Sequence, residues 1–501
     1  MSSTVIRLSR ADVDDFARAS GDVNPLHVDE NFARRTPYGG TIAHGVLVVL
    51  AAMAAVPADR LAAVGSLTAR FSRPVRPGAV CRPKVRCAAD GSVAVEVREG
   101  EITVLRVDMR PGPSFAGAAE PMDLVLPPVA EVPDVETMRV GDRQRGKYAV
   151  ASLGALGDLA RRMGAGALPP ALLGALAWSS WYVGMRRPGR SALFAKVTVR
   201  VDPAPAEQTG PPEYSTVLTT LEPRTGTLVT EAVCTGSAAG VRISMQAFHR
   251  PPVTPPRSDL LPAGDRLTGA RILVVGGSRG LGAAFTAAFA GQGATVWAAH
   301  RPAGSAAGLR AEFGERVHSL PMDAADEVGV RTAIGALAAT GTLIDGVVLS
   351  AGPAVLSSSL HPDSVASMRS FIDTSVAMAL NPLTAALPML RPDGWLVVVS
   401  SSTVEDHPEE WPHYTMAKAA VEALAAHCAH RRGLRVLVAR APRMWTDMSN
   451  GPLGRVGATP TEQVASAVTA WVMAGGGSGS VSVLGSGELA AWPPTRIEGP
   501  R

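Results

Sequence analysis

Tyr414 and Lys418 stand four residues apart in a chain with only 5 tyrosines, where the other lysines are Lys84, Lys147 and Lys196. Residues four apart lie on one face of an α-helix, so the phenol and the ammonium group would be neighbours. A nearby cation favours the phenolate and makes tyrosine a usable proton donor or acceptor near neutral pH. The pair therefore predicts a proton-transfer site. The alternative is a chance pair on a helix surface.

Asp22 and His27 form a second candidate acid/base pair, five residues apart on a loop around Pro25. Gly45 then opens an apolar stretch that reaches Val56. This stretch predicts a buried helix, whose first N–H groups could stabilise an enolate oxygen. Such a set suits removal of a proton α to a thioester carbonyl with loss of water. The alternative is a turn in which Asp22 caps a helix and His27 is structural.

The elements that must position Tyr414 and Lys418 begin with a strand, a glycine turn and a helix over residues 271–290, with the glycines Gly276, Gly280 and Gly282. Glycines there let a pyrophosphate approach the helix N-terminus. Further strands are predicted at 294–299, 344–349, 395–399, 434–439 and 480–484. This alternation predicts an α/β Rossmann fold, a doubly wound parallel sheet with its ligand at the carboxyl ends of the strands.

These residues together resemble the short-chain dehydrogenase/reductase family over about residues 267–490, most closely its 3-ketoacyl-thioester reductases. The resemblance implies that Ser401 holds the substrate oxygen and that Tyr414 transfers the proton. It implies that Lys418 binds the nicotinamide ribose and lowers the pKa of Tyr414. The cofactor-binding residues that it implies are Gly276, Ser278, Arg279, Gly280, Leu281, Gly282, Arg301, Asp323, Ala351, Gly352 and Lys418.

The chain departs from the family's pattern at three positions. Ser350 stands where the family has asparagine, and Arg443 replaces the usual glycine after Pro442. The relay asparagine of the family aligns with Ser375, which we take as a possible relay residue. A serine can hold a relay water, so these departures affect the expected rate more than the chemistry.

The residue at the end of the second strand favours NADPH over NADH. An acid there would bind the ribose 2′-hydroxyl of NAD, but the position is His300, followed by Arg301. Arg279 lies within the glycine turn, and guanidinium groups suit a 2′-phosphate. The alternative is that Arg301 is a solvated surface charge.

The sequence Gly-Asp-Val-Asn-Pro-Leu-His-Val-Asp at 21–29 resembles the hot-dog-fold enoyl-thioester hydratases, the MaoC-like or (R)-specific group, over about residues 5–112. By this resemblance Asp22 and His27 are the catalytic pair, the Gly45 amide belongs to the oxyanion hole, and Asn24 supports the loop. The segment 71–78 would start the outer strands of the sheet.

Residues 138–252 look like a second copy of this domain. The separation from Gly45 to Arg70 differs by one residue from that between Gly174 and Arg200, but no histidine occurs between His44 and His249. We therefore predict an α+β double hot-dog with one active half, and the alternative is an unrelated insert. The predicted organisation is a hot-dog domain at 1–112, a linker at 113–137, a degenerate hot-dog domain at 138–252, a linker at 253–266, a reductase domain at 267–491 and a tail at 492–501.

The composition of the chain argues against some classes of partner and some cellular compartments. A formal net charge of +4 over 501 residues, with no basic block, argues against a nucleic-acid partner. The 4 cysteines are scattered without a metal-ligand pattern, which predicts a reducing compartment and no metal site. We see no signal peptide, and the apolar runs belong to buried helices, so we expect a cytoplasmic protein without a membrane partner.

Together the two halves predict consecutive steps on one substrate class. We expect a bifunctional ketoreductase–dehydratase acting on thioesters of acyl carrier protein or coenzyme A, in fatty-acid or polyketide assembly, and a homodimer. One alternative is the reverse direction, enoyl-CoA hydration followed by NAD-linked oxidation, as in β-oxidation. The other is a carrier-docking scaffold with one dead site.

Overall fold

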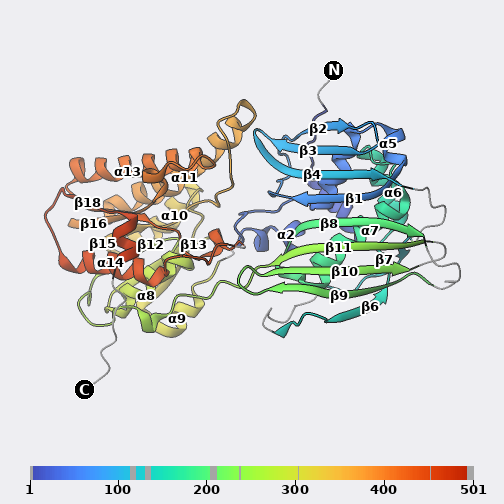
Figure 1. Cartoon of the computed structure of the whole chain (residues 1–501). Helices are drawn as coiled ribbons and strands as arrows, with labels where there is room; N and C mark the ends of the chain where they lie inside the picture. Colours follow the sequence, from blue (N-terminus) through green and yellow to red (C-terminus); the bar gives the residue numbers. More distant parts are fainter. Residues whose placement is uncertain are drawn as a thin grey trace. The chain divides into compact units, whose positions relative to one another are not determined.

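The computed structural model describes residues 4–112, 120–129, 137–203, 211–235, 239–302, 304–451 and 453–492. The chain divides into two compact units, one formed mainly by residues 1–252 and the other mainly by residues 253–501 (Figure 1).

The first unit is built on one nine-stranded antiparallel sheet in the order β2-β3-β4-β1-β8-β11-β10-β9-β6. Side chains alternate between its faces, so Leu67 and Ala69 of β1 are buried while Arg70 is exposed. The strands are β1 Val64–Phe71, β2 Arg82–Cys87, β3 Val93–Glu99, β4 Ile102–Pro111, β6 Arg143–Lys147, β8 Ala192–Pro203, β9 Glu213–Glu222, β10 Thr227–Thr235 and β11 Ala239–His249.

Two helices that are apolar on all sides, α4 and α7, pack against this sheet and share one core with it. A helix without a polar face is stable only when it is buried. The helices of this unit are α1 Arg10–Ser20, α2 Pro25–Val28, α3 Glu30–Ala33, α4 Gly45–Ala52, α5 Ala58–Ala62, α6 Leu153–Arg162 and α7 Pro170–Trp181, which continues as a π-helical turn, Tyr182–Arg186.

The strands are arranged in the same way on both sides of the middle pair of the sheet, β1 and β8. On one side come β4, β3 and β2 with α4, and on the other come β11, β10 and β9 with α7. The predicted boundary between residues 1–112 and 138–252 therefore runs through a continuous sheet. Ser66–Arg70 of β1 pair directly with Lys196–Arg200 of β8.

Two sequence-based expectations for this unit are wrong in detail. The segment 71–78 does not start a strand, because β1 ends at Phe71 and β2 begins at Arg82. Pro74 and Pro77 lack the N–H that a ladder needs. The predicted linker 113–137 also contains β5 (Met122–Asp123), which pairs with β7 (Ala149–Val150), while 113–119 and 130–136 lie outside the described residues.

The second unit contains a seven-stranded parallel sheet in the order β14-β13-β12-β15-β16-β17-β18. All six strands predicted for this half form within a few residues of the expected bounds. The edge strand β14 was missed because its sequence, Val-His-Ser-Leu-Pro, has little apolar character. The strands are β12 Arg271–Val275, β13 Thr295–His300, β14 Val317–Pro321, β15 Ile344–Leu349, β16 Leu390–Ser401, β17 Arg435–Ala441 and β18 Val481–Leu484.

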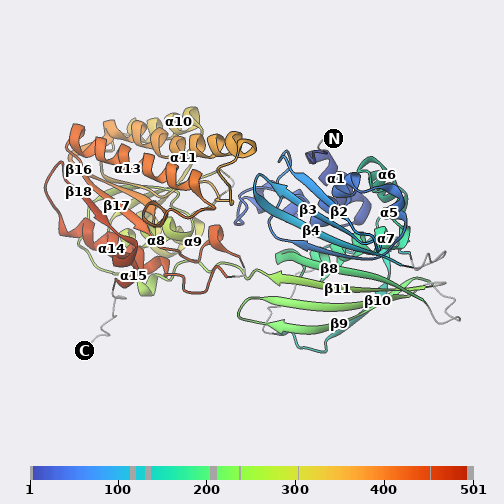
Figure 2. The ribbon, with the colours of Figure 1, turned by 45° about the horizontal axis from the view of Figure 1, so that its top comes forward.

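Helices cover both faces of this sheet, as a doubly wound fold requires (Figures 1 and 2). One core lies under α8 and α14, and a second lies under α10, α11 and α13 on the opposite face. The helices are α8 Gly280–Gly291, α9 Ala307–Phe313, α10 Glu327–Ala338, α11 Val365–Ala386, α12 Thr403–Asp406, α13 Pro412–Arg432, α14 Thr461–Ala474 and α15 Ser486–Ala491. Of the predicted tail, 493–501 lie outside the described residues.

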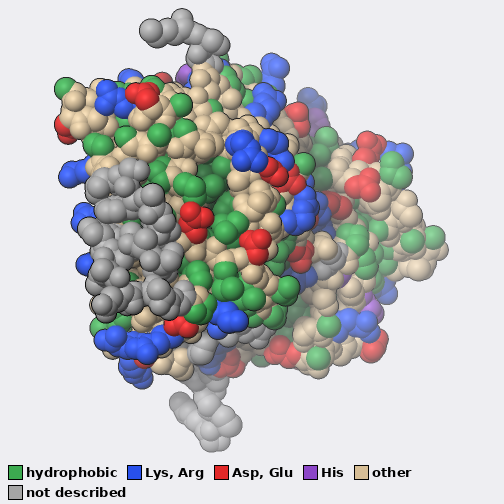
Figure 3. Space-filling model, turned by 90° about the vertical axis from the view of Figure 1, so that its right-hand side faces the viewer, with side chains coloured by type: hydrophobic (Ala, Val, Ile, Leu, Met, Phe, Trp, Pro, Cys, Tyr) green, Lys and Arg blue, Asp and Glu red, His purple; other side chains and the backbone are tan. Residues whose placement is uncertain are grey.

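The described part of the chain contains no helix that is both long and apolar enough to cross a membrane. On the face of the first unit shown in Figure 3, basic, acidic and apolar side chains are interspersed, and Lys and Arg do not gather in one continuous patch there.

Two candidate active sites

Asp22 and His27 are brought together by two short helices. Helix α1 ends at Ser20, and the positive φ of 82° at its cap Gly21 turns the chain so that Asp22 points into the core, where it is 2% exposed. Asn24 caps α2 by accepting a hydrogen bond from the Leu26 amide at 3.0 Å, and α2 carries His27. A carboxylate oxygen of Asp22 and a ring nitrogen of His27 lie within 4.8 Å of each other.

His44, which the sequence analysis did not select, completes this cluster. It precedes α4, is fully buried, and stacks on His27 with ring centroids 3.8 Å apart. Its Nε2 donates to the Asp22 carbonyl at 2.9 Å and lies 3.9 Å from the Asp22 carboxylate. The three side chains are close enough to hold a metal ion. However, Nε2 of His44, the nitrogen that faces the Asp22 carboxylate, carries the hydrogen that it donates to the Asp22 carbonyl. In this state Nε2 is not a metal ligand.

The environment moves the pKa values of these groups in opposite directions. Burial is the largest cause that lowers the pKa of His27 to about 3, with His44 adding to it and Asp22 opposing it. Burial likewise lowers the pKa of His44 to about 3. Burial raises the pKa of Asp22, while His27, Ser180 and the Asn24 amide lower it. Both imidazoles are therefore neutral at neutral pH, and Asp22 keeps its proton to a higher pH than an exposed aspartate.

The tautomer of His27 follows from its partner. Its Nδ1 lies 2.8 Å from the Ile42 carbonyl, which only accepts, so Nδ1 carries the hydrogen. The lone pair is then on Nε2, which is the form that a general base needs.

The second half of the unit holds Asp22 in place. Ser180 on α7 donates to Asp22 Oδ2 at 2.7 Å, and Asn24 donates to the Gly184 and Gly189 carbonyls at 2.6 and 3.1 Å. A Cβ at Gly184 would lie 2.5 Å from Asp22 Oδ1, so only glycine leaves room for the carboxylate. The sequence analysis missed Ser180; the one signal was a pair of serines in an otherwise apolar helix.

Gly45 begins α4, where the first N–H groups of a helix have no partner within the helix. A Cβ at Gly45 would lie 2.7 Å from the ring of Phe71, so the glycine allows β1 and the start of α4 to approach closely. The helix end is therefore available next to His44 and His27 as a source of N–H donors.

In the second unit, β12 runs into the predicted glycine turn and then into α8. Gly276 has a φ of 84° and passes Ala351, whose Cα would lie 3.0 Å from a Cβ at Gly276. A Cβ at Gly282 would collide with the Gly276 carbonyl. The turn is thus a close cradle between the end of β12, the segment after β15 and the N-terminus of α8, and it fits a dinucleotide pyrophosphate.

Ser401, Tyr414 and Lys418 also meet at the carboxyl edge of this sheet. Ser401 is the last residue of β16, and its hydroxyl is hydrogen-bonded to that of Tyr414 on α13. Lys418 lies one turn further along α13 and donates to the Val399 carbonyl at 2.8 Å. Its Nζ is 5.7 Å from the centroid of the Tyr414 ring.

The pKa of Tyr414 differs from the expectation. Burial raises it above the ordinary value of 10, and the hydrogen bond with Ser401 opposes this rise. Burial lowers the pKa of Lys418 to about 8, while the carboxylate of Glu422 opposes that fall. The net pKa of Tyr414 is therefore above its ordinary value in this structure, because burial outweighs the groups that favour the phenolate.

Ser375 and Arg279 have partners of their own. Ser375 donates to the Phe371 carbonyl within α11 at 2.8 Å, and the Phe371 ring lies 6.2 Å from the ring of Tyr414. Arg279 pairs with Asp447 at 2.9 Å.

The remaining predicted cofactor residues sit at the ends of their strands. Arg301 directly follows β13, whose last residue, His300, bonds to Ser319 at 2.7 Å. Asp323 follows β14 and accepts from the Ala325 amide at 3.1 Å. Arg301 and Asp323 thus come after neighbouring strands of the sheet.

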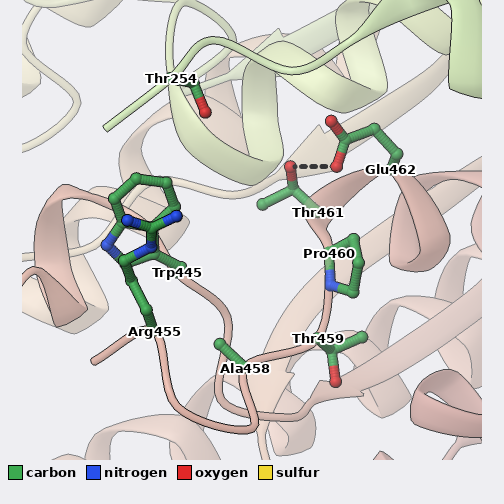
Figure 4. A pocket seen from close by; sticks show the side chains of 8 residues that line it. All are labelled: Thr254, Trp445, Arg455, Ala458, Thr459, Pro460, Thr461 and Glu462. Carbon is green, nitrogen blue, oxygen red and sulfur yellow. Dashed lines mark hydrogen bonds between the residues drawn. The ribbon is translucent and has the colours of Figure 1, made fainter. Parts of the chain in front are cut away.

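Residues of the loop after β17 line an open pocket of about 220 Å³ together with Thr254 and the start of α14 (Figure 4). Arg455 lies over the ring of Trp445, with Cζ 4.4 Å from its centroid. Arg443, which replaces the usual glycine, closes the loop, because its carbonyl accepts from Thr459 at 2.9 Å and its guanidinium donates to Val456. The loop follows the carboxyl end of a parallel strand, where such folds bind ligands.

Comparisons with known proteins match both units. Residues 2–108 match the family model described as a MaoC like domain, and residues 270–451 match the model for short chain dehydrogenase. Over 85 residues the chain is 42% identical to a 3-hydroxybutyryl-CoA dehydratase from Methylorubrum extorquens, a match that covers 16% of this chain and 54% of the relative. The chain thus spans about half the length of that curated relative.

Two solved structures are similar to parts of the chain. A short chain dehydrogenase from Burkholderia cenocepacia in complex with NADP is 26% identical, with a TM-score of 0.38 over 45% of this chain and 100% of that chain. A dehydrogenase/reductase from Sinorhizobium meliloti is 22% identical, with a TM-score of 0.39 over 47% of this chain and 98% of that chain.

Proposed function

Because the chain carries a MaoC-like dehydratase domain and a short-chain dehydrogenase domain, we propose that it reduces 3-ketoacyl thioesters with NADPH and then dehydrates the (R)-3-hydroxyacyl product to the enoyl thioester. The substrates are thioesters of coenzyme A or acyl carrier protein, and the two steps belong to fatty-acid or polyketide assembly. The active form is a homodimer.

In the reductase site, Ser401 and Tyr414 bind the 3-keto oxygen with their hydroxyl groups. A bound nicotinamide cofactor would supply the hydride for C3. Tyr414 gives its proton to the oxygen on which negative charge develops, and Lys418 binds the ribose and favours the phenolate that remains. The high pKa of Tyr414 suits this reductive direction, because the phenol keeps its proton until the substrate oxygen takes it.

In the dehydratase site, Nε2 of neutral His27 removes the C2 proton. The C3–O bond breaks, and the hydroxyl leaves as water with a proton from Asp22. N–H groups at the start of α4, including that of Gly45, stabilise the enolate oxygen of the thioester. The tautomer of His27, with its lone pair on Nε2, supports its role as the base, and the raised pKa of Asp22 agrees with its role as the acid.

We propose that the first unit is a double hot-dog with one active half. The mirrored strand order around β1 and β8, with one central helix for each half, supports this fold. The second half has no histidine before His249. Around α7 the rings of Tyr148, Trp178, Tyr182 and Tyr214 pack against one another. The second half contributes Ser180, which donates a hydrogen bond to Asp22.

The preference for NADPH rests on the residues beyond β13. His300 ends the strand and Arg301 follows it, so no carboxylate stands there to bind the 2′-hydroxyl of NAD. Arg279 in the glycine turn is a second guanidinium, although its pairing with Asp447 reduces its charge toward a phosphate. A lower Kd for NADH than for NADPH would contradict this choice.

The single observation that carries the proposal is that one chain holds two acid–base sets suited to consecutive steps on one thioester. The test follows NADPH oxidation by absorbance with a short 3-ketoacyl-CoA, with mass spectrometry of the products. We expect an enoyl product. A 3-hydroxyacyl product alone would contradict the dehydratase assignment, and no oxidation would contradict the reductase assignment.

Two variants assign the steps to their sites. Tyr414→Phe removes the proton donor and should lower reduction by about 10²- to 10⁴-fold while hydration of an enoyl-CoA is unchanged. His27→Ala should do the reverse. If either variant leaves both steps intact, the residue assignment is wrong.

A further inference from the structure

The helix face that carries Tyr414 and Lys418 continues to Glu422, one further turn along α13. The three side chains meet three successive residues at the end of β16. Tyr414 bonds to Ser401, and Lys418 donates to the Val399 carbonyl at 2.8 Å. Glu422 accepts from Ser400 at 2.6 Å, so the whole face is fastened to one strand end.

Arg440 fixes the carboxylate of Glu422 with two parallel bonds. Its Nε and Nη2 donate to the two oxygens of Glu422 at 3.0 and 2.8 Å, the planar arrangement that orients a carboxylate most firmly. Ser400 and Arg440 are direct partners in the register of β16 and β17. Their side chains therefore project on the same face of the sheet, toward α13.

Glu405 also belongs to this group of charged side chains, in which the positive and negative charges are equal in number. Arg440 also donates to Glu405 at 3.3 Å, and Ser486 donates to Glu405 at 3.0 Å. The side chains of Glu422 and Arg440 are 15% and 26% exposed. Glu405 and Glu422 thus flank Arg440, and Lys418 lies one turn before Glu422 on α13. Removal of one charge at such low exposure leaves another without compensation.

We propose that Glu422 is a positioning residue of the reductase site, which acts through Lys418 by keeping its ammonium group charged and directed at the Val399 carbonyl. The inference rests on the proposed reductase function. Without a negative neighbour, a buried lysine loses its proton and can neither bind a ribose nor favour a phenolate. In support, the Glu422 carboxylate raises the pKa of Lys418 against the effect of burial.

Several charged or titratable groups lie on α13 and on the elements packed against it. The strands contribute Arg435 and Arg440 of β17 with Arg391 and Asp393 of β16, and α12 contributes Glu405 and Asp406. On α11, Arg369 and Asp373 are exposed to solvent. On α13 itself, His413 and Tyr414 precede Lys418, and the groups that follow it are Glu422, His427, His430, Arg431 and Arg432. Of these groups, Glu422 is the one whose charge acts on the pKa of Lys418.

The direct test measures the titration of Lys418 without any substrate. The chain has only the lysines Lys84, Lys147, Lys196 and Lys418, so lysine-selective 13C labelling of the full protein gives few signals, and a Lys418→Met sample assigns the relevant one. We expect Glu422→Gln to lower the Lys418 titration midpoint by about one pH unit or more. We expect Glu422→Asp, which keeps the negative charge, to lower it less than Glu422→Gln does.

The two variants distinguish charge from packing, since Glu422→Asp shortens the side chain but keeps its charge. A midpoint that stays fixed in Glu422→Gln, or that falls equally in both variants, would overturn the proposal. The matched control is Glu327→Gln, which breaks an exposed Glu–Arg pair on α10 and should leave the midpoint in place.

Enzyme kinetics provide the second readout. The kcat/KM for reduction should fall at a lower pH in Glu422→Gln than in the wild type, by the same shift as the titration midpoint. A lower melting temperature with an unchanged pH profile would mean that Glu422 is only structural. A wild type that reduces no 3-ketoacyl thioester would contradict the proposed function but leave the titration result standing.

Discussion

Asp22 and His27 acquire different roles from neighbours that the loop itself does not contain. Burial favours the neutral form of both side chains. The neutral form of Asp22 is an acid, whereas the neutral form of His27 is a base. His44 stacks on one and bonds to the backbone of the other. Burial and the neighbouring groups Ile42, His44 and Ser180 therefore determine which atoms of the site carry a proton.

Ser180→Ala should lower the rate of dehydration about tenfold, because a hydrogen bond to a carboxylate is worth on the order of 1.5 kcal/mol or more. The measurement is kcat and KM for an enoyl-CoA in the hydration direction. The control is Ser179→Ala, since the adjacent buried serine donates only to the Leu176 carbonyl of its own helix. Equal effects of the two variants would show that Ser180 has no special bearing on Asp22.

The same variant should also shift the pH dependence, with a defined sign. The Ser180 bond lowers the pKa of Asp22, so its loss raises that pKa. Dehydration requires protonated Asp22 and declines as pH rises through this value. The alkaline limb of the profile should therefore move to higher pH in Ser180→Ala, and a shift to lower pH would contradict Asp22 as the acid.

Among the elements, the turn between β12 and α8 depends most directly on residue size. Gly276 requires a positive φ, and Gly282 faces the Gly276 carbonyl with no space for a side chain. The cradle that we propose for the pyrophosphate forms because Gly282 can approach the Gly276 carbonyl closely. That approach also aligns the α8 N-terminus with the end of β12.

Gly282→Ala should abolish NADPH binding, measured by fluorescence titration, and lower the melting temperature, because a Cβ collides with backbone that cannot move aside. The matched control is Gly335→Ala in α10, where a Cβ would meet nothing within 4 Å. There the higher helix propensity of alanine should stabilise the protein by up to about 1 kcal/mol. Normal NADPH affinity in Gly282→Ala would contradict the role of the turn.

For the molecule as a whole, the two units have separate hydrophobic cores. One core joins both halves of the first unit, and two others cover the faces of the parallel sheet in the second. Each unit contains a complete set of the residues proposed for its own step.

Separate cores predict two calorimetric transitions, of which NADPH raises only one. Ligand at about 100 times Kd adds roughly 2.7 kcal/mol to the unit that binds it, which corresponds to an increase of about 5 to 10 °C. Differential scanning calorimetry with and without NADPH measures this. A His27→Ala sample should show the same increase. An equal rise of both transitions would contradict the assignment of the cofactor to the second unit alone.

Much of this protein follows from local sequence. The glycine turn, six of the seven strands of the parallel sheet and the spacing of Ser401, Tyr414 and Lys418 were readable because each depends on a few neighbouring residues with a strong conformational or chemical preference. Asp22, Asn24 and His27 were readable for the same reason, since one capped turn brings them together. The family matches at 2–108 and 270–451 confirm both resemblances.

Tertiary structure alone decided the partners of those residues. Ser180 lies 158 positions from Asp22, and Arg440 lies 18 from Glu422, so no short-range pattern reveals either bond. The pKa of Tyr414 was misjudged for the same reason, because burial is a property of the packed fold. Sequence specifies which groups can do chemistry, whereas desolvation and distant neighbours, which only folding brings together, set the protonation state in which they do it.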